Sequence, residues 1–184
     1  MRAFRKRVWI AAVLVSAGAS LWAQKSEKKK APAPTPEPKP CTAAPYRQFD
    51  FWLGDWDVVD SAGKPAGKNH VVSLFDGCGL QENWESAQGA RGTSLNVYDA
   101  VTGHWHQTWL DDHAGLLQLD GGLDGGKMVL VGSRPSVKDK GTRVVHRIIW
   151  TPMDDKVLQH WEFSKNEGRT WTTVFDGTYV RRKS

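Results

Sequence analysis

The chain has 184 residues, with 25 Lys and Arg against 20 Asp and Glu, and a formal net charge of +5. Residues 1–44 hold nine of the basic and two of the acidic residues, so the remaining 140 residues carry a net charge of −2. A slightly acidic body removes the main sequence argument for nucleic-acid binding.

The N-terminus has the pattern of a secretory signal peptide. A basic patch over residues 2–7 precedes an apolar run from Val8 to Val15, and small residues follow. This order predicts a signal peptide over residues 1–23, cleaved after Ala23 or, as the second choice, after Ala19. The apolar stretch is shorter than the about 20 residues of a membrane-spanning helix. We therefore expect a periplasmic or secreted bacterial protein, without a stable membrane span after cleavage.

The following residues, 24–44, are predicted to form a disordered linker. The stretch from Lys25 to Pro40 contains five Lys, five Pro and no large apolar residue, and such a segment cannot bury enough surface to fold. Its charge allows at most a weak contact with anionic envelope surfaces. Cys41 and Cys78 lie outside any metal-ligand spacing. In an oxidising compartment the pair predicts a disulfide that joins the linker to the folded body.

Residues 45–182 are predicted to form one all-β domain, because turn signals recur every 8–14 residues between short runs of Val, Ile, Leu, Thr and Trp. A short helical turn within residues 46–53 should precede the first strand. About ten strands are expected, at approximately 55–61, 68–75, 79–86, 91–99, 103–110, 115–120, 126–133, 142–151, 156–164 and 169–180. Short connections favour pairing of neighbours, and a twisted meander tends to close on itself. We predict an antiparallel up-and-down barrel, with a Greek-key sandwich as the alternative.

The string FDFWLGDWDV, from Phe49 to Val58, resembles the start of calycin barrels, the superfamily of lipocalins and fatty-acid-binding proteins. The whole string, together with GCGLQENWES, HWHQTWLDD and the end from Trp171 to Tyr179, is similar to an uncharacterised group of secreted bacterial lipocalin-like proteins. The resemblance covers about residues 45–181. It implies a fold and a location but no activity.

The calycin resemblance also implies structural roles at the closed end of the barrel. Gly54 and Trp56 match the Gly-x-Trp of the first strand, and the Trp should pack near a basic residue after the last strand, here Arg181 or Arg182. The side chains of Phe49, Phe51 and Trp52 should cover this end, while Asp55 and Asp57 face solvent. Asp50 is expected to be the N-cap of the helical turn.

Alternation of side chains along the strands predicts which residues point inward. In LQENWES the set Gln81, Asn83 and Glu85 is wholly polar and should face water, which turns Glu82 inward. The strand at 91–99 is undecided, because Ser94 and Asn96 share one face and Leu95 and Val97 the other. The residues predicted to line a ligand pocket are Glu82, Trp84, Asn96, Trp105, Gln107, Trp109, His146, Gln159 and Trp161.

These inward sets combine indole rings with single polar groups. An unpaired buried polar group costs about 1–3 kcal/mol, so a dry core would not select them, whereas aromatic walls with a few fixed polar groups describe a binding pocket. The alternative is a core in which these polar groups satisfy one another.

The leading functional hypothesis is therefore a barrel that binds a small amphipathic or apolar molecule. The alternative is an enzyme acting on a small molecule, with Glu82 as general acid or base, its pKa raised by burial, and His146 as its partner. No nucleophile motif or phosphate-binding loop supports catalysis.

Haem on His146 and carbohydrate binding by Trp and carboxylates are weaker alternatives. The pair His104 and His106 is interpreted as a surface pair and not as a metal site. The segment SKNEGRTW, Ser164 to Trp171, resembles the Asp-box of sialidases but is interpreted only as a hairpin turn. No cofactor and no metal is predicted.

Overall fold

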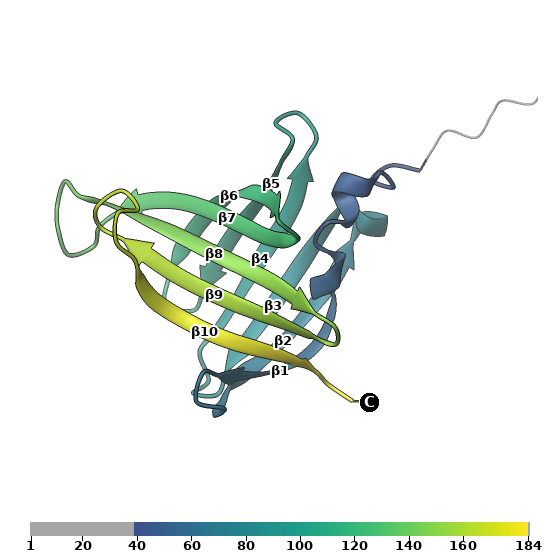
Figure 1. Cartoon of the computed structure of the whole chain (residues 1–184), viewed down its shortest axis with the longest axis horizontal. Coiled ribbons are helices and arrows are strands. Elements are labelled where there is room, and N and C mark those ends of the chain that lie inside the picture. Colours follow the sequence, from purple (N-terminus) through teal and green to yellow (C-terminus); the bar gives the residue numbers. More distant parts are fainter. Residues whose placement is uncertain (1–38, 184) are drawn as a thin grey trace, which may run out of the picture. The chain divides into compact units, whose positions relative to one another are not determined.

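The computed structural model describes residues 39–183, so the predicted signal peptide and all but the last six residues of the predicted linker lie outside it. Ten antiparallel strands form a closed barrel in which neighbours in sequence pair and β1 pairs with β10 (Figure 1). This is the predicted up-and-down meander. The strands are β1 (Gly54–Asp60), β2 (Pro65–Leu74), β3 (Gly79–Ser86), β4 (Arg91–Asp99), β5 (His104–Asp111), β6 (Leu116–Asp124), β7 (Lys127–Pro135), β8 (Arg143–Met153), β9 (Lys156–Ser164) and β10 (Thr172–Arg181).

The predicted strand spans differ from the structure mainly where Gly or Pro lies inside a strand. β6 runs four residues beyond its predicted end, because Gly121 lets its backbone pass close to the carbonyl group of Val129 on β7. β2 begins at Pro65, a position at a strand start that proline tolerates. β10 begins later than predicted, because the residues before Thr172 belong to a turn.

Two short 3₁₀ turns, η1 (Ala44–Arg47) and η2 (Asp50–Trp52), precede β1 at the closed end of the barrel. They correspond to the predicted helical turn. The prediction that Asp50 is the N-cap is wrong: Phe49 occupies that position, and no side chain caps the turn. Asp50 instead lies 3.4 Å from Arg47 as an ion pair.

The closed end is filled by a dense aromatic cluster. Phe49 stacks on Trp52 with 5.0 Å between ring centroids, and it meets Trp105 and Trp150 edge-on at 5.6 and 5.1 Å. All four side chains are almost fully buried. Edge-to-face and offset aromatic pairs stabilise a core beyond their area burial. This cluster is therefore the hydrophobic core that anchors η2 to the strands, as predicted for Phe49 and Trp52.

The Gly-x-Trp of β1 and the end of β10 meet as the sequence resemblance implied. The Arg181 guanidinium lies 4.3 Å from the centroid of the Trp56 ring, and its Nη1 donates a hydrogen bond of 3.2 Å to the Leu53 carbonyl oxygen. Gly54 has φ +133°, and a Cβ atom at this position would overlap that guanidinium. The adjacent Arg182 contacts Asp57 instead, 3.3 Å away on the outer surface.

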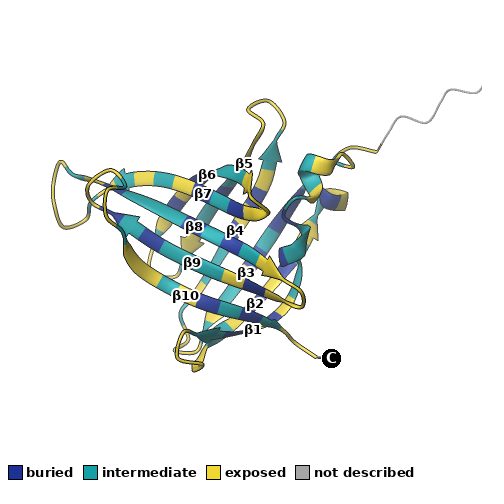
Figure 2. Ribbon diagram, viewed as in Figure 1, coloured by how far each residue is buried: buried dark blue, intermediate teal, exposed yellow. Residues whose placement is uncertain are grey.

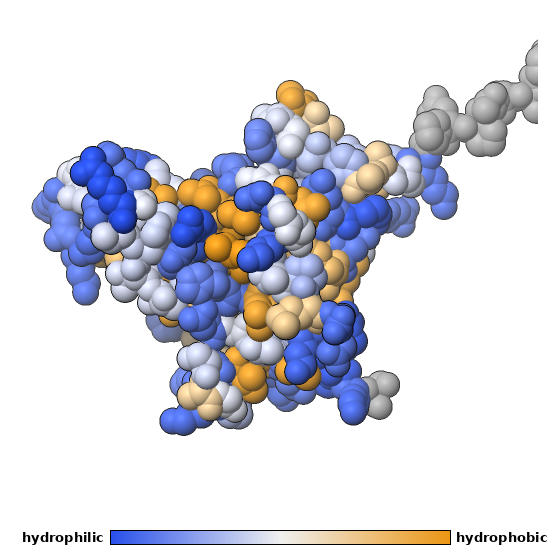
Figure 3. Space-filling view, viewed as in Figure 1, coloured by the Kyte–Doolittle hydropathy of each residue, from blue (hydrophilic) through white to orange (hydrophobic). Residues whose placement is uncertain are grey.

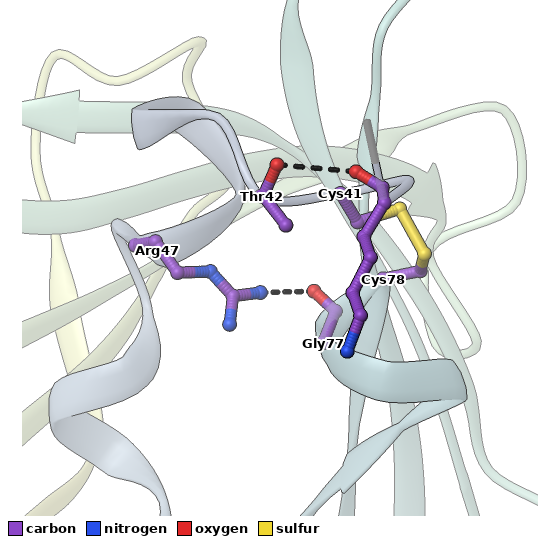
Figure 4. The surroundings of a disulfide bond; sticks show 6 residues. Cys41, Thr42, Arg47, Gly77 and Cys78 are labelled. Atoms are coloured by element: carbon purple, nitrogen blue, oxygen red, sulfur yellow. Dashed lines mark hydrogen bonds between the residues drawn. A yellow bond between two sulfur atoms is a disulfide. The ribbon is translucent and has the colours of Figure 1, made fainter. Parts of the chain in front are cut away.

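A disulfide joins Cys41 to Cys78, as predicted, and so connects the segment before η1 with the turn between β2 and β3. That turn contains η3 (Phe75–Gly77). Figure 4 shows a second link across the same junction, in which Arg47 donates from Nη2 to the Gly77 carbonyl oxygen. The disulfide and this hydrogen bond thus join the segment before β1 to the turn between β2 and β3.

Buried and exposed residues alternate along the strands (Figure 2). On β4, which the sequence left undecided, the polar face is inside: Ser94 and Asn96 are 0% and 2% exposed. Leu95 and Val97 are 51% and 43% exposed on the outer wall. Figure 3 shows that apolar groups elsewhere also reach the surface between polar ones. Polar partners inside the barrel, described below, explain this inversion.

Substitution of Gly54 by Ala should test the contact that closes the barrel. Ala at φ +133° is strained, and its methyl group would displace the Arg181 guanidinium from Trp56. We expect the free energy of unfolding to fall by about 2–4 kcal/mol. Gly63→Ala is the matched control, because Gly63 also has a positive φ, +77°, but nothing lies within 4 Å of its Cβ position. Equal urea midpoints for the two variants would contradict the assigned role of Gly54.

Candidate functional site

The inside of the barrel contains a cavity of about 200 Å³ towards the end opposite the aromatic core. A cavity of about 150 Å³ is enough to hold benzene, so this one has room for a molecule of one or two rings. Its lining residues come from six strands: Glu82, Trp84, Gln107, Trp109, Leu117, Ile148, Gln159, Trp161, Val174, Phe175 and Tyr179.

Four aromatic side chains form the wall of the cavity nearest the open end of the barrel, which we call the aromatic rim: Trp84, Trp109, Trp161 and Phe175. Each lies two or three residues from the end of its strand at the open end of the barrel, and each is half-buried. The rings of Trp84 and Phe175 meet edge-on at 5.9 Å. The rim therefore presents flat apolar surfaces to the cavity.

Three inward-facing glycines make room for this rim. A Cβ atom on Gly67 or Gly92 would overlap the indole of Trp84 or Trp109, respectively, and one on Gly177 would overlap the ring of Phe175. Glycine weakens a strand interior, and it is used where another group approaches closely. Inward glycines close to inward aromatic residues, on the adjacent strand for Gly67 and Gly92 and on the same strand for Gly177, were the sequence signal that could have located the rim.

Below the rim lies a belt of polar side chains, centred on Glu82. Its Oε1 accepts a hydrogen bond of 2.7 Å from Asn69 Nδ2, and its Oε2 accepts one of 2.7 Å from Ser94 Oγ. Gln107 Nε2 in turn donates to Asn96 Oδ1 at 2.8 Å. Asn69, Glu82, Ser94, Asn96 and Gln107 come from β2, β3, β4 and β5. The hydrogen-bond network therefore spans four adjacent strands of the barrel wall.

Burial raises the pKa of Glu82 from 4.5 to about 7, against the opposing effects of the hydrogen bonds from Ser94 and Asn69. The carboxyl group is 4% exposed and forms no ion pair with a described residue. Its protonation state therefore changes near neutral pH. A buried carboxyl group with a raised pKa in a cavity is a candidate functional group.

The opposite side of the belt is formed by Gln159 and Tyr179. The Tyr179 hydroxyl donates to Gln159 Oε1. Burial raises the pKa of Tyr179 well above its usual value, and the nearby Glu82 raises it further, so this phenol remains neutral. Within the described part of the chain, no hydrogen bond engages Gln107 Oε1 or Gln159 Nε2, and both residues line the cavity. The floor thus offers one amide acceptor and one amide donor to an occupant.

The structure brings together six of the nine residues predicted to line the pocket, and it places three elsewhere. Asn96 is buried behind Gln107 and orients its amide. Trp105 belongs to the closed-end core, where its Nε1 donates to Gln48 Oε1 at 3.2 Å. Tyr179, Phe175 and Asn69 were missed, although Asn69 shares a strand face with the apolar Val71 and alternation alone would have placed it inside.

His146 lies beside the rim and does not line the cavity. Its Nδ1 accepts a hydrogen bond of 3.2 Å from Trp161 Nε1, which requires an unprotonated nitrogen. Burial lowers the pKa of His146, and the charge of Arg134 lowers it further, which agrees with this role. Asp111 acts similarly on the next indole, accepting from Trp109 Nε1 at 3.2 Å. Both residues therefore orient rim indoles, and His146 makes no hydrogen bond to Glu82.

A cluster of paired charged side chains lies on the outer wall of the barrel. Glu162 is 7% exposed and accepts from Arg147 Nε at 2.7 Å, while His160 lies between Glu162 and Asp176, at 3.3 and 2.5 Å. The hydrogen bond to Asp176 raises the pKa of His160, and Glu162 adds to the effect. The indole of Trp171 covers the cluster, with the Arg147 guanidinium 4.1 Å from its ring centroid. We interpret this closed set of ion pairs as structural.

The Asp-box-like segment forms a hairpin turn, as interpreted from the sequence. Ser164 Oγ accepts from the Gly168 amide at 2.8 Å, and Asn166 Oδ1 accepts from the Thr170 amide at 2.9 Å. On β5, His106 contacts Asp120 and Thr108 at the outer surface. Within residues 39–183, no group of three or more His, Cys, Asp or Glu side chains is arranged to hold a metal ion.

Comparisons with protein-family models and with curated proteins found no match to this chain. The described residues contain no helix of sufficient length and apolarity to cross a membrane.

Neutralisation of Glu82 should change how stability depends on pH. Because burial raises its pKa, the folded state binds a proton that the unfolded state has lost between pH 4.5 and about 7, and stability falls as pH rises through this window. Glu82→Gln cannot ionise at this position, so the variant does not lose this stability. The difference in free energy of unfolding, variant minus wild type, should therefore increase by about 3 kcal/mol as the pH rises from 4.5 to 8.

Urea unfolding of both proteins at pH 4.5, 6 and 8 measures this difference. Glu85→Gln is the control, because it removes the same charge from an exposed position on the same strand. A stability difference that does not vary with pH for Glu82→Gln would show that Glu82 ionises normally.

Proposed function

We propose that this protein binds a small amphipathic molecule inside the barrel, with the apolar part between the rings of the aromatic rim and the polar end on the belt around Glu82. The observation that carries the proposal is the layering of the cavity, with flat apolar walls above and hydrogen-bonding groups below. Ligand pockets combine these two features, since apolar walls supply affinity and a few polar groups fix orientation. The size of the cavity limits the buried part of the ligand to one or two rings.

The order of the layers favours binding over a self-satisfied polar core. Most of the belt is internally hydrogen-bonded, but Gln107 and Gln159 line the cavity, and Gln107 Oε1 and Gln159 Nε2 have no hydrogen-bond partner among the described residues. A ligand that offers a donor and an acceptor would satisfy both. The rim is half-buried, whereas Glu82 and Gln107 are nearly inaccessible. An apolar molecule therefore has a direct approach from the open end.

Substitution of rim indoles should weaken binding. We use three naphthalenes that differ only in the head group: 2-naphthylmethylamine, 2-naphthylmethanol and 2-naphthoic acid. Each of Trp109→Ala and Trp161→Ala should raise the dissociation constant of the tightest of them about tenfold or more, because each removes an aromatic contact. Isothermal titration calorimetry measures the constants.

Trp171→Ala is the matched control, since it removes an indole from the outer wall and should leave the affinity unchanged. Absence of binding by all three probes at millimolar concentration would overturn the proposed function. An equal loss of affinity in Trp171→Ala would place the binding site outside the barrel.

The second candidate is an enzyme that uses Glu82 as a general acid or base, and its specific support is the pKa of about 7 inside a cavity. The geometry is less favourable to it. Both carboxylate oxygens are already hydrogen-bonded, and His146, the expected partner, serves Trp161 instead. Equal turnover by wild type and Glu82→Gln in any activity that is found would exclude this role.

The proposed location is the bacterial periplasm or the extracellular space. It is supported by the leader pattern of residues 1–23 and by the disulfide, a bond that persists in oxidising compartments. N-terminal sequencing of the protein recovered from a periplasmic fraction should begin at Gln24. A mature protein that retains Met1 would contradict the leader.

A further inference from the structure

The carboxyl group at the floor of the cavity has no counter-ion. Glu82 is held by Asn69 Nδ2 and Ser94 Oγ, which are neutral donors. Among the described residues, the one titratable group that interacts electrostatically with Glu82 is Tyr179, which stays neutral. A buried carboxylate is strongly destabilised unless it is paired. In its ionised form Glu82 therefore lacks the positive partner that a buried anion requires.

Among residues 39–183, the unpaired polar atoms next to Glu82 are mainly acceptors, whereas the one unpaired amide donor, Gln159 Nε2, belongs to the opposite side of the belt. Each carboxylate oxygen accepts one hydrogen bond from the protein and retains a further lone pair. Gln107 lines the cavity, its Nε2 donates to Asn96 and Ser94, and its Oε1 has no hydrogen-bond partner among the described residues. The Oδ1 atom of Asn69 is buried without a partner in the described part of the chain. An occupant with several N–H donors matches this floor better than one with acceptors.

The aromatic rim suits a positive charge as well. The faces of Trp, Tyr and Phe rings attract cations, and sets of such rings recognise ammonium groups. Within residues 39–183, protein cations lie over two indoles, those of Trp56 and Trp171, and neither belongs to the rim. The rim rings above Glu82 are therefore free to interact with a charged ligand.

We propose that the ligand is a cationic amine: an ammonium head that donates to the Glu82 carboxylate and to Gln107 Oε1, carried on an apolar body of one or two rings that lies within the aromatic rim. This inference rests on the proposed function and specifies the chemical class of its ligand. Charge pairing at the floor distinguishes it from the recognition of a neutral or acidic molecule.

The same three naphthalenes test the proposal, since their ring systems are identical and their heads are cationic, neutral and anionic. At pH 8 the amine should bind at least tenfold more tightly than the alcohol, and the acid should bind most weakly. Lowering the pH to 6 protonates Glu82 and should weaken amine binding severalfold, with little change for the alcohol. Calorimetry at both pH values provides the constants.

Glu82→Gln separates charge pairing from shape. The variant should lose at least tenfold in amine affinity and change by less than threefold for the alcohol, and retained alcohol binding shows that its pocket is intact. Glu85→Gln, which removes an outward charge from the same strand, should bind the amine like wild type.

The outcomes for the class of ligand and for the site are distinct. If the alcohol or the acid binds at least as tightly as the amine, or if the preference for the amine survives in Glu82→Gln, the proposed amine class is wrong while the binding site stands. If none of the three probes binds, the proposed function itself fails.

Discussion

Pairing of β1 with β10 is the constraint on which the rest of this structure depends. It turns a meander of hairpins into a cylinder, so that every second side chain of every strand has to lie inside. The pairing ends at Trp56 opposite Arg181, where the guanidinium covers the indole and Gly54 leaves room for it. Once the cylinder is closed, alternation along each strand decides which side chains point into it. Polar residues at inward positions then become neighbours although they are far apart in sequence.

The two ends of the barrel interior differ in how they are packed. Aromatic side chains at the closed end form a tightly packed core, in which the indole nitrogens of Trp52 and Trp150 are buried without a hydrogen-bond partner among residues 39–183. The open half keeps polar groups and glycines instead. Each unpaired buried polar atom costs about 1–3 kcal/mol, so a barrel selected only for stability would fill this half with hydrocarbon. The core at one end compensates for a cavity at the other.

Two buried glutamates, Glu162 and Glu82, differ in whether the protein supplies a positively charged partner. Glu162, on the outer wall, is paired with Arg147 and lies beside His160. Glu82, on the inner wall, has only the neutral donors Asn69 and Ser94. The first carboxylate is neutralised within the protein. The second is only partly ionised near pH 7, because burial raises its pKa. A positively charged occupant would offset the desolvation cost of its charged form, because charge pairing strengthens in a medium of low dielectric constant.

Much of the architecture was already determined by the sequence. Turn spacing specified ten strands, and the bounds of β3, β4 and β9 were predicted to the residue because each is flanked by clear turn residues. Alternation placed Glu82, Gln107, Gln159 and three indoles inside. The same rule left β4 undecided: its apolar residues Leu95 and Val97 would ordinarily lie inside, but Ser94 and Asn96 lie there instead, because side chains on other strands pair with them.

The tertiary structure decided what local patterns cannot express. It placed Trp105 in the core and Trp109 in the rim, although both lie on one face of β5, because depth along the barrel axis follows from strand register and closure and not from alternation. It also brought Asn69 from β2 against Glu82. The sequence by itself determined the barrel, its inward residues and its two cysteines; which inward residues share a layer, and that the carboxyl group among them lacks a counter-ion, depends on contacts between strands that only the closed cylinder creates.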